Sequence, residues 1–191
     1  MRKLVYYVGV SLDGYIAGPD DRIDFYPLGE DMVAWMTADY PETLPGHVRP
    51  HFGLRVDAPN QAFDTLVMGR GTYEPALAAG LSSPYGHMRQ YVVSTTLGEI
   101  ADPSVELVTD ALATVRALKA EDTGMDIWLA GGGRLAAALL PEIDELIVKS
   151  YPVVAGTGVP AMSGEFRPTL FSPTRTRAFD NGTRVTWFSR V

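Results

Sequence analysis

Short runs of hydrophobic residues without polar alternation recur along the chain, and turn residues or segments with helical spacing separate them. Residues 4–10 are nearly all apolar, which in so short a segment indicates a strand buried on both faces of an α/β sheet. Helical spacing is found in residues 30–40, with Val33, Trp35 and Met36, and after residue 110, where Ala111, Val115 and Leu118 line one face. Further strands are predicted at 65–68, 90–94, 105–108, 127–130 and 145–154.

The C-terminal part of the chain has a different pattern. Residues 169–180 and 183–190 are rich in β-forming residues and are joined through Asn181-Gly182, which predicts a two-residue hairpin. Parallel β/α units followed by an antiparallel hairpin predict a three-layer αβα fold of the α/β class, with a mixed, mainly parallel sheet of about eight strands. A chain of 191 residues suits a single domain that spans residues 1–191.

The segment 127–140, IWLAGGGRLAAALL, predicts a strand, a glycine turn and a helix. Gly131, Gly132 and Gly133 leave no side chain between the backbone and a ligand above the end of the strand. The first turn of a helix offers unpaired N–H groups and the positive end of a dipole, and these suit a phosphate. Arg134 can add a permanent charge, and Leu135 begins the buried helical face. The alternative is a tight turn that needs positive φ.

A second unit of the same kind is predicted at residues 62–74. A short strand ends at Gly69, and Arg70 and Thr72 then open a helix. Arg70 places a basic side chain in the turn, while Thr72 either contacts a ligand or caps the helix by accepting a bond from a free N–H group. The strand at 90–94 ends in Ser94 and Thr95, whose hydroxyl groups either contact a ligand or form turns.

Polar loops follow the first strand. In open α/β sheets ligands lie beyond the carboxyl ends of strands, so residues 11–17 are a candidate wall of the site. Asp13 within them is either a turn residue or a carboxylate that faces substrate. Residues 18–29 read as a loop, and residues 41–59, with four prolines, predict an extended loop of the length common in lids and binding walls. His47 and His51 are spaced i, i+4, but Pro50 disfavours the helix that a metal pair would need.

Composition narrows the classes of partner. The chain has no cysteine, which excludes disulfides, thiolate catalysis and Cys-ligated zinc, so the cytoplasm is the expected compartment. A formal charge of −7 argues against binding to nucleic acid or to an anionic membrane. No apolar stretch approaches the roughly 20 residues that span a bilayer. A small-molecule substrate is therefore favoured.

Four motifs in order, SLDGYIAG, LVMGRGTYE, YVVST and WLAGGGRL, resemble the dihydrofolate-reductase-like fold. Within it, the chain is similar to the reductase domain at the C-terminus of bacterial RibD proteins of riboflavin biosynthesis, as a stand-alone member. The resemblance implies NADPH as cofactor, a cis peptide between Gly131 and Gly132, and a homodimer as a possible assembly. It implies that the adenosine-side phosphates are held by Gly69, Arg70 and Thr72 and the ribose by Ser94 and Thr95. The pyrophosphate would be held by Gly131, Gly132, Gly133, Arg134 and Leu135. The nicotinamide carboxamide would contact Ile16 and Ala17.

The expected activity is NADPH-dependent reduction of a small heterocyclic, carbonyl or imine substrate, pterin-like or pyrimidine-like. Asp13 is the first candidate for a proton donor, with Tyr15 or water as alternatives. Asp31 or Met32 occupies the position at which a folate reductase has its pterin-binding carboxylate. The rival class is a non-catalytic nucleotide-binding or regulatory module of the same fold. A hydrolase ranks last, because no nucleophile elbow or Ser/His/Asp order is present.

Overall fold

The computed structural model describes residues 1–191 and contains one large sheet. Its eight strands lie in the order β5-β4-β3-β6-β1-β7-β10-β9, and a small second sheet pairs β2 with β8. The large sheet is parallel from β5 to β7, and β10 runs antiparallel to both β7 and β9. The strands are β1 Leu4–Val10, β2 Tyr15–Ala17, β3 Phe63–Gly69, β4 Arg89–Val93, β5 Val105–Val108, β6 Asp126–Gly131, β7 Ile143–Ser150, β8 Val159–Pro160, β9 Phe171–Ala178 and β10 Arg184–Arg190.

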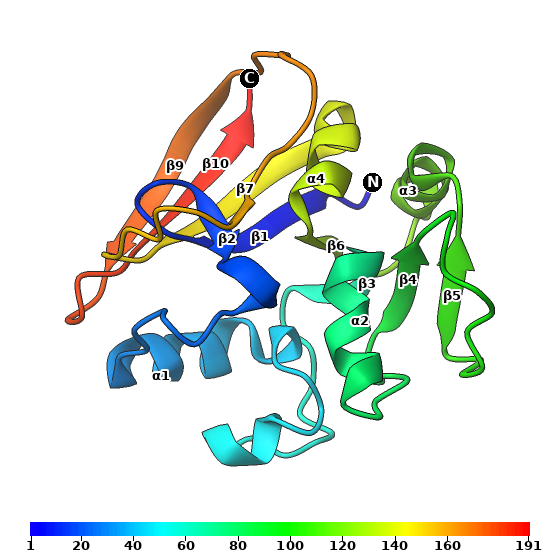
Figure 1. Cartoon of the computed structure of the whole chain (residues 1–191), viewed down its shortest axis with the longest axis horizontal. Coiled ribbons are helices and arrows are strands. Elements are labelled where there is room, and N and C mark those ends of the chain that lie inside the picture. The colour runs from blue at the N-terminus through cyan, green and yellow to red at the C-terminus, as the bar shows by residue number, and fades with distance from the viewer.

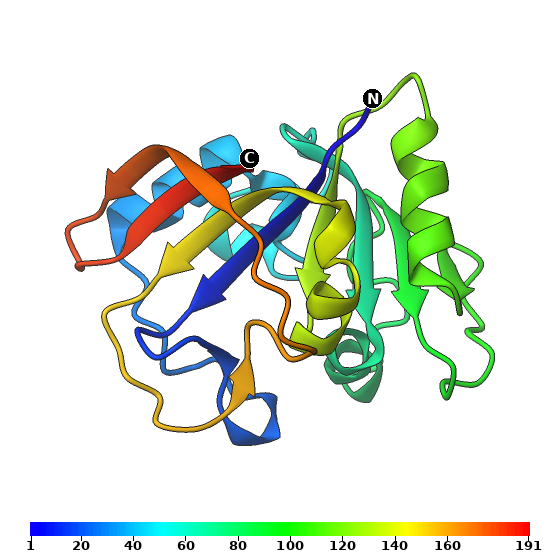
Figure 2. The same cartoon turned by 90° about the horizontal axis from the view of Figure 1, so that it is seen from above.

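Helices cover both faces of the sheet, as the three-layer prediction requires (Figure 1). Seen from above, α3 and α4 lie over the strands, and α1 and α2 lie beneath them (Figure 2). The helices are α1 Glu30–Asp39, α2 Arg70–Ala78, α3 Ala111–Ala120 and α4 Gly133–Ala138. Short 3-10 helices span Pro19–Asp21, Pro41–Thr43, Arg49–Phe52 and Leu140–Glu142. None of the helices is long and apolar enough to cross a membrane.

Each face of the sheet has its own hydrophobic core, which explains why the central strands show no alternation. In β1, Val5 and Tyr7 belong to the core under α1 and α2, while Leu4, Tyr6 and Val8 belong to the core under α3 and α4. Both sets are less than a tenth exposed. A strand with helices on both sides excludes water from every position, so its sequence is a continuous apolar run.

The C-terminal hairpin forms as predicted, but its turn is longer than two residues. β9 and β10 pair as far as Ala178 and Arg184, and Phe179 N–H donates to the Thr183 carbonyl at 2.9 Å, which leaves a three-residue loop. Within that loop only Gly182 has positive φ, at +85°. A two-residue type I′ turn needs positive φ at both central residues, and Asn181 does not adopt it.

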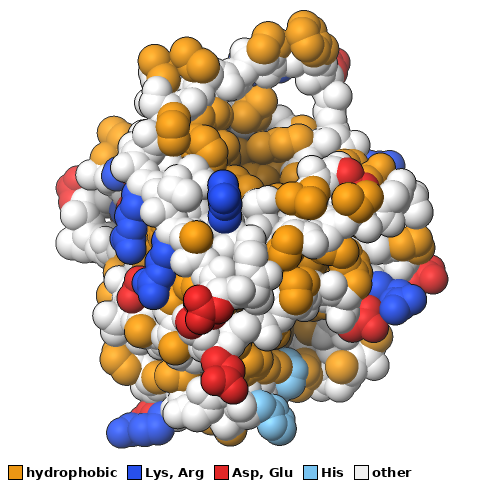
Figure 3. All heavy atoms as spheres, turned by 90° about the vertical axis from the view of Figure 1, so that its left-hand side faces the viewer, with side chains coloured by type: hydrophobic (Ala, Val, Ile, Leu, Met, Phe, Trp, Pro, Cys, Tyr) orange, Lys and Arg blue, Asp and Glu red, His pale blue; other side chains and the backbone are white.

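The half of the sheet nearest β9 is less completely covered. β9 is exposed along nearly its whole length, and the segment before it carries Phe166, 97% exposed, and Leu170, 70% exposed. The face on the left of Figure 1 is hollowed near its top, and hydrophobic side chains gather in the hollow (Figure 3). The best-packed part of the fold therefore lies around β1, β3 and β6, where the glycine turns begin.

Candidate cofactor and substrate site

The two strand–glycine–helix units lie side by side at the carboxyl ends of adjacent strands. β3 and β6 are neighbours in the sheet, and Met68 pairs with Gly131. A Cβ atom built on Gly69 would stand 3.5 Å from the Gly131 carbonyl oxygen and 3.6 Å from the Gly132 nitrogen. The absence of side chains on both sides therefore lets the two turns approach each other closely.

The three consecutive glycines serve different purposes. Gly131 has φ of +113°, the left-handed region that favours glycine. Gly132 has φ of −80°, and nothing lies within 4 Å of the position of its missing Cβ. At Gly133 a Cβ would overlap the Pro160 carbonyl oxygen. The predicted cis peptide between Gly131 and Gly132 is confirmed. Only Gly132 thus opens toward free space, where a ligand could meet the backbone.

Two arginines flank these turns with exposed guanidinium groups. Arg134 is exposed and forms no ion pair or side-chain hydrogen bond. Arg70, the first residue of α2, has a side chain 47% exposed that donates from Nε to Glu74 at 2.6 Å and from Nη1 to Thr96 Oγ1 at 2.8 Å. The Arg70 guanidinium is therefore held beside the end of β4, the strand predicted to end in hydroxyl groups.

The hydroxyl groups near Arg70 divide into structural and free ones. The predicted cap at Thr72 is wrong: α2 begins at Arg70, after Gly69, so Thr72 lies inside the first turn and caps nothing. Ser94 is 8% exposed, and its Oγ accepts from Thr96 N–H at 3.1 Å and from Leu97 N–H at 2.9 Å. The Ser94 hydroxyl therefore forms the turn after β4, and Thr95 remains exposed.

Ile16 and Ala17 are brought to the glycine turn by the small second sheet. β2 pairs with β8, so Ala17 lies opposite Val159, and the Ala161 N–H donates to the Gly14 carbonyl at 2.9 Å. Ile16 Cδ1 is 3.8 Å from a Cβ built on Gly131. The residues predicted to meet the nicotinamide thus lie next to those predicted to hold the pyrophosphate.

Asp13 links two loops, and its contacts argue against the predicted role as proton donor. Its Oδ1 accepts from Ser11 Oγ at 2.7 Å and from the Ala155 N–H at 2.9 Å, and Oδ2 accepts from the Gly156 N–H at 2.7 Å. The Ser11 hydroxyl and these backbone donors lower the pKa of Asp13 to about 2. A carboxylate that is fully ionised near neutral pH, with both oxygens engaged, is poorly suited to donate a proton.

Asp31 and Met32, the candidates for the pterin-binding position, lie at the start of α1. Asp31 Oδ1 accepts from Met32 N–H at 2.8 Å, and Oδ2 accepts from the Asp180 N–H at 2.9 Å. Asp31 therefore ties α1 to the C-terminal hairpin loop. Met32 is completely buried in the core under α1. Neither residue presents a free carboxylate to a ligand.

The loop at residues 41–59 is more ordered than its prolines suggest. Arg49 is completely buried, and its guanidinium donates to backbone carbonyls, among them Val56 at 2.8 Å and Ala58 at 3.1 Å. Glu42 is also completely buried, and its carboxylate accepts from three successive N–H groups at residues 61–63, at 2.8 to 3.1 Å. The sequence analysis missed both residues, although charged side chains inside a proline-rich segment were a signal that polar anchors hold the loop.

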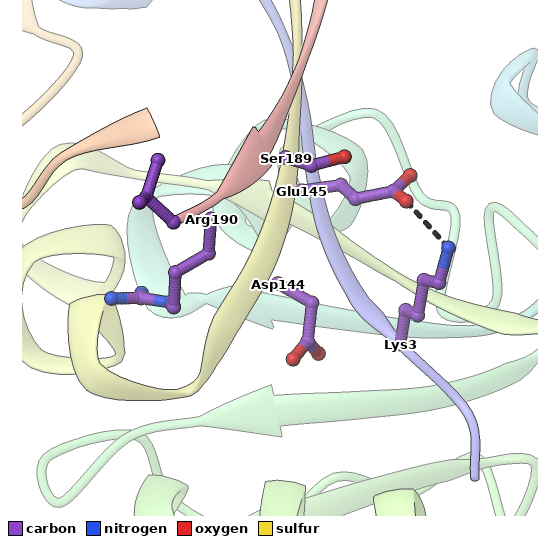
Figure 4. Close-up of a pocket in the computed structure, with 6 residues that line it drawn as sticks. Lys3, Asp144, Glu145, Ser189 and Arg190 are labelled. Carbon is purple, nitrogen blue, oxygen red and sulfur yellow. Dashed lines mark hydrogen bonds and ion pairs between the residues drawn. The ribbon is translucent and has the colours of Figure 1, made fainter. Parts of the chain in front are cut away.

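Two cavities of about 420 Å³ each lie away from the glycine turns. One is at the amino ends of β1 and β7, at the opposite end of the strands, and the Lys3–Glu145 ion pair lies across it (Figure 4). The other lies between the 41–59 loop and the segment before β4, where it includes His47 and His87. Polar residues and exposed ion pairs line the first cavity, so it offers little apolar surface to a cofactor ring.

The fold, with its paired strand–glycine–helix units, is an α/β domain of the dihydrofolate-reductase-like type. The model of the RibD C-terminal domain matches residues 2–185, so the chain belongs to that family. It is 30% identical over 161 residues to "Uncharacterized protein YwjB" of Bacillus subtilis (strain 168), covering 83% of this chain and 82% of the relative. It is 27% identical over 194 residues to "Uncharacterized protein YyaP" of the same strain, covering 95% and 91%.

The fold also matches a solved structure along its full length. The crystal structure of "Putative riboflavin biosynthesis protein" from Shewanella sp. PV-4 superposes with a TM-score of 0.70 at 23% identity, covering 100% of this chain and 99% of that chain. At this identity the likeness establishes the fold alone. The predicted fold class and the predicted family are therefore confirmed.

Proposed function

We propose that the protein is an NADPH-dependent reductase of a small heterocyclic, carbonyl or imine substrate, pterin-like or pyrimidine-like in size. The observation that carries this proposal is the pair of adjacent glycine turns, with open space above Gly132 and the exposed guanidinium groups of Arg134 and Arg70 beside the turns. Backbone without side chains and two exposed guanidinium groups, of which only that of Arg70 has a carboxylate partner, fit a dinucleotide with several phosphates. Membership of the RibD C-terminal domain family supports the same assignment.

We assign the residues of this site to successive parts of the cofactor. Gly132 and Arg134 would hold the pyrophosphate, Arg70 the 2′-phosphate and Thr95 the ribose, while Ile16 and Ala17 would meet the nicotinamide through their backbone. When bound, NADPH supplies a hydride to an electrophilic carbon of the substrate. The chain contributes binding, orientation and the exclusion of water. The loops at residues 11–29 and 41–59 then form the substrate wall.

The proposal is tested by following oxidation of NADPH with a panel of pterins, pyrimidines, flavins and quinones. The panel includes ribosylated pyrimidines, because the name of the Shewanella protein points to riboflavin biosynthesis. At least one compound is expected to support turnover that depends on enzyme concentration. Tight binding of NADPH without turnover of any compound would favour the rival, a non-catalytic nucleotide-binding module. Failure to bind NADPH would contradict both.

A further inference from the structure

The chain has three lysines, and one of them has no ionic partner. Lys3 pairs with Glu145, and Lys119 pairs with Asp144 and Glu142. Lys149 forms no ion pair and donates no side-chain hydrogen bond. A mostly enclosed amine without an acceptor is uncommon in a folded protein, because removing it from water without compensation costs free energy.

Lys149 lies near the carboxyl end of β7, in the middle of the sheet. It pairs with Gly9 of β1 on one side and with Val185 of β10 on the other. Its Nζ stands 4.1 Å from the centre of the Tyr7 ring, on the face of the sheet that α1 covers. Because β1 and β6 are parallel neighbours, this end of β7 is the same end of the sheet at which the Gly131 turn lies.

An aromatic wall connects Lys149 to the loop that carries Ile16. Tyr151, two residues beyond Lys149, stacks on Tyr26 with ring centres 4.5 Å apart, and the Tyr26 hydroxyl donates to the Tyr15 carbonyl at 2.5 Å. A Cβ on Gly9 would stand 2.9 Å from the Tyr151 ring and 3.8 Å from Lys149 Cε. Glycine at position 9 therefore leaves room for both side chains against β1.

The surroundings of the amine contain no free carboxylate. Burial raises the pKa of Tyr7, Tyr26 and Tyr151, so all three rings are neutral near neutral pH. Glu42 acts electrostatically on Tyr7 and Asp13 on Tyr26, but both carboxylates are engaged elsewhere: Glu42 with three backbone N–H groups and Asp13 with Ser11 and two further N–H groups. Across β10, Arg175 and Arg177 stack on Trp187 and Phe179 and add positive charge to the same face.

In these surroundings the amine changes its charge near neutral pH. Burial lowers the pKa of Lys149 to about 7, because the charged form loses hydration and gains no counter-ion. The side chain nevertheless keeps part of its surface accessible. A group that is both reachable and half-protonated near neutral pH meets the two requirements of a general acid.

We propose that Lys149 faces the substrate and donates the proton that accompanies hydride transfer. The inference rests on the proposed reductase function and extends it to the reacting group. Hydride from the reduced nicotinamide forms a C–H bond as the C=O or C=N π bond of the substrate breaks, and its electron pair takes the proton from the Lys149 ammonium. The substrate is reduced and the nicotinamide oxidised, and the neutral amine regains its proton from water. A cationic proton donor therefore favours a substrate with a carbonyl oxygen or imine nitrogen over one with a cationic ring.

The protonation state of Lys149 can be measured without any substrate. Protein labelled with ¹³C at lysine Cε gives three signals, and the signal missing from Lys149→Met identifies Lys149. Lys149 is expected to titrate near pH 7, and Lys3 above 10.5 because its bond to Glu145 raises the pKa. A Lys149 signal that titrates above pH 10 would overturn the inference whatever the cofactor does.

The same signals test whether Lys149 lies by the nicotinamide. The oxidised ring is cationic and the reduced ring is neutral, so saturating NADP⁺ should lower the titration midpoint of Lys149 by about one pH unit relative to NADPH. Lys3, at the other end of the strands, should not respond. Binding is verified independently by the thermal shift that each cofactor produces. If both cofactors bind and the two midpoints coincide, Lys149 is not the proton donor and the proposed function stands; if neither binds, both proposals fail.

Activity then provides a third readout once a substrate is in hand. Lys149→Met should lower turnover by about 10²–10⁴-fold with little change in NADPH affinity. Lys149→Arg keeps a cation that cannot release a proton near neutral pH, so it should not restore turnover. Lys3→Met is the matched control and should turn over normally. Full turnover by Lys149→Met would exclude the proposed role.

Discussion

Gly132 and Gly133 are adjacent in sequence, but alanine at the two positions should affect different properties: cofactor binding at Gly132 and folding stability at Gly133. A methyl group on Gly132 would enter open space, at a φ of −80° that alanine adopts readily. The gain from reduced freedom of the unfolded chain is about 0.4–1 kcal/mol. The loss from alanine at the N-cap position is of similar size, about 0.5 kcal/mol or more. The melting temperature should therefore stay nearly unchanged.

At Gly133 the same methyl group would overlap the Pro160 carbonyl oxygen and stand 3.2 Å from the carbonyl carbon and 3.3 Å from that of Ala161. These are backbone atoms, so relief requires β8 to move. Overpacking of this kind costs about 1–3 kcal/mol. At roughly 2–4 °C per kcal/mol for a chain of this size, the melting temperature should fall by about 2–12 °C.

Binding of NADPH separates the two variants further. In Gly132→Ala the methyl group occupies the space through which a pyrophosphate would reach the backbone, so affinity should fall at least about tenfold, which corresponds to about 1.4 kcal/mol. Calorimetric titration with NADPH measures the affinity, and scanning calorimetry measures the stability. A Gly132→Ala variant that is stable and binds NADPH as well as the parent would refute the placement of the pyrophosphate at this turn.

Three further outcomes follow from the contacts. Arg70→Ala should abolish any preference for NADPH over NADH, whereas Glu74→Gln, which frees the guanidinium from its ion pair, should strengthen it; both are read from the affinities for the two cofactors. Asp13→Asn should lower the melting temperature, and because the folded pKa is depressed to about 2, the difference from the parent should be full above pH 4 and vanish as the pH falls toward 2 in a series of melts. Glu42→Ala leaves three N–H groups without their acceptor, so denaturant unfolding should report a loss of about 3–6 kcal/mol, and a loss below 1 kcal/mol would contradict the anchoring role.

Strand positions and the glycine turns could be predicted because their signals are local. Unbroken apolar runs indicated strands buried on both faces of the sheet, and the strand predicted at Val105–Val108 coincides with β5. α3 begins where the helical spacing was predicted, and Asp110 caps it, since its side chain accepts from the Ala113 N–H at 2.9 Å. The family motifs then placed Gly69 and Gly131 in one site, and the sheet order brings them together.

The parts that escaped prediction depend on contacts distant in the sequence. The roles of Asp13 and Asp31 are set by N–H groups at residues 155, 156 and 180, more than 140 positions away along the chain. Nothing in the sequence around Lys149 distinguishes it from other lysines in β-strands. Only the packing around Tyr7 and Gly9 shows that its amine has no ionic partner. The local sequence pattern indicates which backbone conformation a segment prefers. The charge state of a side chain depends instead on the groups that the folded chain places around it.

Equilibrium binding of NADPH and NADH to the unmodified protein tests the central claim most directly. Both cofactors offer the same nicotinamide and pyrophosphate, and only NADPH offers the 2′-phosphate that Arg70 would bind. Energy transfer from the tryptophans to the reduced nicotinamide provides the signal. We expect saturable binding of both, with NADPH at least about tenfold tighter, which corresponds to about 1.4 kcal/mol. No binding of either cofactor would contradict the account, and equal affinities would remove Arg70 from it.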